Sequence, residues 1–190
     1  MNIAFDATGI EVWKGSGIGN YTLNQFKAMA SASPQDEFYY FNIIADSPLI
    51  DAITAANFHK IFIYTGIDEF IQKGGEQYYQ LLGSIIKNFI TEYSIDIFYI
   101  TAPFTYSAAL YKREWFKDAA VIASVYDIIP YVMREVYLNQ EEMFNWYISC
   151  INMLRTVDRL LAISMSVKED MVKHLSFNPD NIDVIYGGVG

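Results

Sequence analysis

The feature that most constrains the fold is a series of short apolar runs that alternate with longer helical patterns. Two of these runs are apolar almost without interruption, which is typical of strands buried on both faces of a parallel sheet. Strands are predicted at residues 2–6, 38–45, 60–64, 95–101, 119–126, 159–163 and 182–186. Repeated strand–helix–strand units of this kind predict an α/β fold: a doubly wound, mostly parallel sheet of about seven strands with helices on both faces.

The helical patterns lie between these strands, and the clearest one repeats apolar residues at three- and four-residue steps. Helices are predicted at residues 18–30, 76–93, 139–155 and in a segment that reaches residue 174. A short helix is also predicted after Ser47, with a proline in its first turn. We expect Asn139 to cap the third long helix, and Ser166 with Glu169 to form a capping box for the last.

Composition excludes several classes of protein. The 190 residues suit a single domain over residues 1–190, and 53% hydrophobic against 18% charged residues excludes a disordered chain. The net charge of −9 argues against nucleic acid and anionic lipid as main partners. The single cysteine, Cys150, excludes a disulfide scaffold and fits a helix core. Without a basic leader or a long uncharged stretch, we expect a cytoplasmic protein with at most peripheral membrane association.

Ligands of doubly wound sheets bind beyond the carboxyl ends of the strands, so the residues at those ends are the first site candidates. They are Asp6, Asp46, Thr101, Tyr126, Asp127 and Ser164. Thr101 begins a polar-aromatic loop that could contact a sugar ring or simply pack. Asp127 could bind a sugar hydroxyl, or accept backbone N–H bonds within a turn. Ser164 could donate to a ligand oxygen, but its role as a helix cap is favoured.

The loop that follows the first strand is rich in glycine just before a helix. Gly15, Ser16, Gly17 and Asn20 are therefore candidates for phosphate or substrate binding, because backbone N–H groups at a helix N-terminus attract anions. The alternative is a flexible loop with an ordinary helix start. The loop is not a dinucleotide fingerprint, because Asn20 stands where the third glycine is required.

No metal ligand set is evident in the sequence. The only histidines are His59 and His174, and we expect neither to lie near a carboxylate or at metal-ligand spacing. No Asp-x-Asp motif occurs, so a metal site is not expected, and neither is a cofactor.

Several motifs together resemble the N-terminal domain of a family 4 glycosyltransferase of the GT-B fold, over the whole chain. The start MNIAFDATGI with GSGIGNYTLNQFKAM is similar to the first strand, glycine loop and helix of that family. VYDIIP is similar to its strand-ending His-Asp-x-x-Pro motif. VDRLLAISMSVKEDM followed by NIDVIYGGV is similar to the end of the domain.

The resemblance implies retaining, metal-independent transfer of a sugar from a nucleotide-sugar to a glycan or lipid-linked acceptor, between two Rossmann-like halves. This half would hold the acceptor, with Gly17 and Asn20 beside phosphate or acceptor, and Tyr126 and Asp127 near the sugar. Tyr126 stands where the family often has histidine, and Asn20 where many relatives have arginine.

The half that holds the nucleotide is absent from this sequence. We therefore expect the chain alone to be inactive, and to act with a C-terminal donor-binding domain or a partner chain. Two alternatives remain open: a non-catalytic half-domain that associates with itself or another chain, and a small nucleotide- or flavin-binding Rossmann-like domain.

Overall fold

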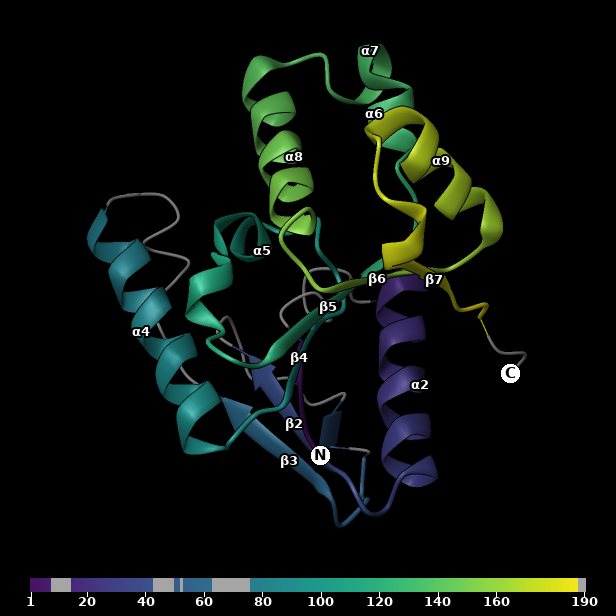
Figure 1. Cartoon of the computed structure of the whole chain (residues 1–190). Coiled ribbons are helices and arrows are strands. Elements are labelled where there is room, and N and C mark those ends of the chain that lie inside the picture. The colour runs from purple at the N-terminus through teal and green to yellow at the C-terminus, as the bar shows by residue number, and fades with distance from the viewer. Residues whose placement is uncertain (8–14, 43–49, 52, 63–75, 188–190) are drawn as a thin grey trace.

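The computed structural model describes residues 1–7, 15–42, 50–51, 53–62 and 76–187 (Figure 1). The strands are β1 Asn2–Asp6, β2 Glu37–Asn42, β3 Phe58–Phe62, β4 Ile97–Ile100, β5 Ala120–Val125, β6 Arg159–Ala162 and β7 Ile182–Val184. The helices are α2 Gly17–Ala32, α4 Glu76–Glu92, α5 Tyr106–Leu110, α6 Ile129–Val132, α7 Arg134–Tyr137, α8 Glu141–Leu154 and α9 Met165–Leu175. Short 3-10 turns lie at η2 Arg113–Trp115 and η3 Pro179–Asn181.

Within the described residues the strands form one sheet of seven, in the order β3-β2-β1-β4-β5-β6-β7. Every neighbouring pair is parallel. The chain winds outward from β1 to β3 and then returns to the other side of β1 with β4. The strand order therefore reverses between β1 and β4, and the predicted doubly wound parallel fold is confirmed.

Alternate residues of each strand enter different cores, because successive side chains of a strand point to opposite faces. Phe5 and Tyr99 pack with Phe26 of α2 on one face of the sheet. Phe98 packs on the other face, in the core that α4, α5, α8 and α9 cover. Figure 1 shows α2 and α4 on opposite sides of the sheet. The central strands β1, β4 and β5 are mostly apolar because both faces are buried there, whereas the edge strands β3 and β7 carry charged residues.

The helices begin close to where the periodicity predicts, but two caps differ from expectation. The residue before α8 is Gln140, which makes no side-chain cap, so the predicted Asn139 cap is wrong. The cap of α9 is Ser164, whose Oγ accepts from the backbone N–H of Val167 at 3.2 Å. The capping box predicted at Ser166 is therefore wrong, since helix α9 already begins at Met165.

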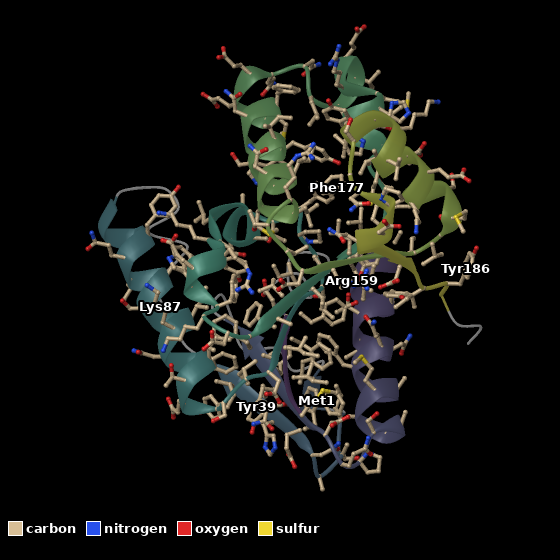
Figure 2. All side chains as sticks on the ribbon, viewed as in Figure 1. Met1, Tyr39, Lys87, Arg159, Phe177 and Tyr186 are labelled. Carbon is tan, nitrogen blue, oxygen red and sulfur yellow. The ribbon has the colours of Figure 1, made fainter. Side chains whose placement is uncertain are left out.

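The amino ends and the carboxyl ends of the parallel strands lie at opposite ends of the molecule; we call these sides the amino edge and the carboxyl edge of the sheet. The N-terminal ammonium pairs with Asp36 at 2.7 Å at the amino edge, where Figure 2 labels Met1 and Tyr39. The carboxyl ends of β5 and β6 lead to α6, α7 and α9 at the far end (Figure 1). Among the predicted features, Asp46 lies outside the described residues; of the short helix predicted after Ser47, only residues 50–51 are described, and they form part of a 3-10 turn.

Candidate functional site at the carboxyl edge

A pocket of about 250 Å³ opens at the carboxyl edge of the sheet, where three distant segments meet. Ile18 comes from the first turn of α2, Tyr126 and Asp127 follow β5, and Tyr147 lies in α8. The rest of its lining is apolar or aromatic: Phe104, Pro130, Tyr137, Leu138, Met143 and Trp146. The structure thus brings the start of the glycine loop's helix together with the predicted Tyr126–Asp127 pair.

Asp127 is held at the pocket by the turn that leads into α6. Its Oδ1 accepts a hydrogen bond from the backbone N–H of Ile129 at 3.0 Å. Pro130 lies in the first turn of α6, where its missing N–H costs nothing. The turn therefore fixes the carboxylate at the pocket wall with one oxygen engaged by the backbone.

Tyr126 is anchored to α2 through its phenol. Its hydroxyl lies 3.0 Å from Oγ1 of the buried Thr22, and its ring meets Tyr21 edge-on at 5.6 Å between centroids. Burial raises the pKa of Tyr126 well above its ordinary value. At neutral pH the side chain is an uncharged phenol, which can share a hydrogen bond but is not a base.

The glycine loop is an ordered helix start in its described part. Ser16 caps α2, its Oγ accepting from the N–H of Gly19 at 3.3 Å. Gly15 has a φ of 76°, a conformation that other residues rarely adopt. Gly17 is exposed and has open space where a Cβ would stand, and Asn20 is exposed as well. The phosphate-binding role of these residues stays a prediction.

Two other predicted residues lie outside the lining of this pocket. Thr101 is fully buried, and its hydroxyl donates to the backbone oxygen of Asp6 at 2.7 Å. The Asp6 carboxylate, also buried, accepts from the Tyr111 hydroxyl at 2.8 Å. The first bond joins the end of β1 to the residue after β4, where the strand order reverses, and the second joins β1 to the end of α5. Ser164 caps α9, the role that the sequence favoured.

Apart from Tyr126, the aromatic residues of the pocket were missed by sequence reasoning. Phe104 stacks on Tyr147 with ring centroids 4.5 Å apart and planes 11° apart. Phe104 belongs to the loop after β4, and Tyr147 to the buried side of α8. The only signal in the sequence is an aromatic pair inside an apolar helix stripe, which is equally typical of plain core.

Both histidines face carboxylates, which corrects the expectation that neither does. His59 Nε2 lies 2.5 Å from Glu37 Oε2, and His174 Nε2 lies 3.9 Å from Asp170 Oδ1. Across the described residues, no group of three or more His, Cys, Asp or Glu side chains is arranged to hold a metal ion. The described helices include none long and apolar enough to cross a membrane.

The parallel sheet and the position of its pocket place the chain among Rossmann-like α/β proteins, whose ligands bind beyond the carboxyl ends of the strands. The sequence profile of Glycosyltransferase Family 4 matches residues 47–190, so the chain belongs to that family. This membership favours the glycosyltransferase interpretation over a small flavin-binding domain. No curated protein matches the sequence.

Solved structures agree on the fold. A glycosyltransferase from Rickettsia africae matches 100% of this chain and 43% of its own, at a TM-score of 0.61 and 15% identity. The lipopolysaccharide outer core galactosyltransferase WaaB matches 100% of this chain and 46% of its own, at a TM-score of 0.58 and 16% identity. A UDP-GlcNAc 2-epimerase from Methanocaldococcus jannaschii matches 97% of this chain and 45% of its own, at a TM-score of 0.55 and 10% identity.

The chain spans just under half the length of these three structures. It therefore corresponds in fold to one Rossmann-like half of a GT-B glycosyltransferase, in keeping with the N-terminal domain that its motifs predicted.

Proposed function

We propose that this chain is the acceptor-side half of a retaining, metal-independent glycosyltransferase that moves a sugar from a nucleotide-sugar to a glycan or lipid-linked acceptor. The observation that carries the proposal is the carboxyl-edge pocket, in which Tyr126 and Asp127 lie beside the start of α2. Family membership supports the reaction class. The absence of an Asp-x-Asp motif supports independence from metal.

Asp127 is the residue that we assign to the acceptor. Its carboxylate stands at the pocket wall and is half-buried, so it can accept a hydrogen bond from a hydroxyl that is about to react. The Tyr126 phenol next to it stays protonated and positions rather than removes a proton. This proposal requires no cofactor. The nucleotide-sugar is a substrate, and the other half would hold most of it.

The second wall of the cleft would cover the apolar surface around α6 and α7. Val132, Met133 and Val136 are 45%, 49% and 63% exposed, and they line an open hollow at the same edge as the pocket. Tyr186, near the C-terminus, is 66% exposed and visible at the outside of the molecule in Figure 2. Arg134, Glu135 and His174 also line the hollow, so it mixes apolar and charged side chains. Exposed large apolar side chains at one edge favour burial by another domain or chain.

The reaction proposal is tested by incubating the 190-residue chain with a panel of nucleotide-sugars and glycan acceptors, and measuring release of nucleoside diphosphate. We expect no release above the uncatalysed rate, because charge on the leaving diphosphate must be stabilised in a closed cleft. Release should appear when the chain is joined to a donor-binding half, and should fall about a hundredfold or more in the Asp127→Asn variant. Turnover by the chain alone would overturn the half-site proposal.

The exposed apolar surface also favours a second candidate, a non-catalytic half-domain that associates with itself. Sedimentation velocity distinguishes the two functions. A stable dimer that the Val136→Glu substitution dissociates would support self-association, whereas a monomer at micromolar concentration would support burial by a donor-binding half. The cytoplasmic location stays a prediction.

A further inference from the structure

The pocket at the carboxyl edge is unusually apolar for a sugar site. Five of its lining residues carry polar side-chain atoms: Tyr126, Asp127, Tyr137, Trp146 and Tyr147. The Tyr126 hydroxyl is already bonded to Thr22. We take the Asp127 carboxylate and the Tyr147 hydroxyl as the two groups that orient a ligand, because Tyr137 is 53% exposed and the Trp146 indole can donate but not accept.

The Tyr147 hydroxyl is buried without a hydrogen-bond partner among the described residues. The side chain is 2% exposed and lines the pocket. A buried hydroxyl with no protein partner is rare in folded proteins, and a water or a ligand group bound beside it would satisfy it. Tyr99 shows the ordinary case: it is equally buried, but its hydroxyl bonds to Ser124 at 2.5 Å and Gln25 at 3.0 Å.

Asp127 offers the complementary group. Its Oδ1 is bonded to the Ile129 N–H, and no hydrogen bond reaches its Oδ2 from the residues that the structure describes. The Asp127 charge also helps burial to raise the pKa of Tyr147, so the two groups act on one another electrostatically. A hydroxyl can donate to a carboxylate and accept from a phenol, whereas a carboxylate ligand would be repelled by Asp127.

The size and lining of the pocket distinguish two kinds of hydroxyl ligand. A pyranose carries hydroxyls around its whole rim, and most of them would be buried here against Phe104, Leu138 and other apolar side chains without partners. A ring or short alkyl group fits better, since a dry cavity of about 150 Å³ already holds benzene. The volume of about 250 Å³ leaves room for a ring with a short substituent.

We propose that this pocket binds the apolar aglycone of a phenol or alcohol acceptor, with its hydroxyl held between Tyr147 and Asp127. The proposal rests on the proposed function for the existence of an acceptor, and in this pocket it replaces the glycan or lipid-linked acceptor with an apolar phenol or alcohol. The binding itself does not depend on transfer. Tyr147 is a specificity-determining residue in this arrangement: its hydroxyl selects ligands that bring a hydrogen-bond partner into an otherwise apolar pocket.

The test compares the affinities of two ligands for the wild-type 190-residue chain and for two variants. NMR chemical-shift titration measures each dissociation constant. 4-Ethylphenol should bind about tenfold more tightly than ethylbenzene, because only the phenol pairs the buried hydroxyl. In the Tyr147→Phe variant the preference should fall to about twofold or less. Tyr99→Phe, whose hydroxyl is satisfied within the protein, is the matched control and should keep the preference. Methyl β-glucoside should bind the pocket at least tenfold more weakly than 4-ethylphenol.

The outcomes separate this inference from the proposed function. Equal affinity of wild-type chain for 4-ethylphenol and ethylbenzene, or a preference that Tyr147→Phe leaves unchanged, overturns the inference. Tighter binding of methyl β-glucoside at the same residues also overturns it, while leaving a glycosyltransferase acceptor site in place. A phenol preference that Tyr147→Phe removes and Tyr99→Phe keeps supports the inference even if no transfer is ever measured in an assembled enzyme.

Discussion

Tyr147 and Tyr99 show how two equally buried residues of one type can have opposite effects on stability. Replacing Tyr147 with phenylalanine removes a hydroxyl that has no partner among the described residues, so the free energy of unfolding should rise by about 1 kcal/mol. Replacing Tyr99 removes a hydroxyl with two partners, so the same free energy should fall by about 1–2 kcal/mol. Urea denaturation measures both values. A loss of stability in both variants would show that the Tyr147 hydroxyl has a partner in the free protein.

Cys150 gives a pH dependence that can be isolated from the tyrosines. Burial raises the pKa of its thiol from 9.0 to about 12. Between these values the unfolded chain loses the thiol proton and the folded chain retains it, so stability falls as pH rises. The contribution is at most about 1.4 kcal/mol per pH unit. Below pH 9 the thiol contributes no pH dependence, because both states are protonated.

The comparison with Cys150→Ala isolates this effect, because the tyrosines titrate in both proteins. The free energy of unfolding of the wild type should fall more steeply than that of the variant from about pH 9 upward. Urea denaturation over this pH range measures the two slopes. Parallel pH profiles would mean that the thiol ionises as easily in the folded chain as in the unfolded one.

At this scale the sequence located part of the site. Tyr126 and Asp127 could be found because they follow a continuous apolar strand, and the carboxyl ends of parallel strands meet at one edge. Phe104 and Tyr147 could not be found. Their role depends on the loop after β4 stacking on α8, a contact between residues far apart in the chain.

At the scale of elements, the corrected cap of α9 can be tested by a matched pair of serines. Ser164→Ala removes the oxygen that accepts from the Val167 N–H, and should lower the free energy of unfolding by about 1 kcal/mol. Ser166→Ala lies inside the helix on an exposed site and should change stability by less than about 0.5 kcal/mol. Thermal denaturation ranks the two. The reverse ranking would restore the capping box at Ser166.

Helix α4 depends on a close approach at Gly83. A Cβ added there would lie 2.8 Å from the indole of Trp115, which is buried and packs against the helix. Gly83→Val should therefore cost about 1–3 kcal/mol through overpacking. Ser84→Val, one residue along the exposed side of the same helix, controls for the lower helix propensity of valine. Chemical denaturation of both variants should show the loss only at Gly83.

The elements themselves were largely predictable because two periodicities dominate the chain. All seven predicted strands occur, since short apolar runs rich in β-branched and aromatic residues are typical of strands buried in a parallel sheet. Helix ends were less predictable: serine at position 164 and at 166 have the same chemistry, and only the backbone shows which one precedes the first turn.

At the scale of the whole molecule, we propose that the chain forms one wall of a cleft. The topology places α2, β5 and α8 around a pocket, and the apolar residues of α6 and α7 lie beside it, open to a second body. Solved structures that match the chain are about twice its length, which fits a cleft shared between two halves. The order of the strands explains why residues from three distant segments meet there.

The most direct test of this account is an NMR map of where glycosyl-transfer ligands contact the 190-residue chain. With a nucleoside diphosphate and a small phenol acceptor added in turn, the account predicts shifts at Gly15–Asn20, at Tyr126–Ile128 and along α8 near Tyr147. Amides at the amino edge, such as those of Glu37 and Asp96, should not move. Shifts confined to the amino edge, or to the α4 face around Lys87 and Trp115, would contradict it.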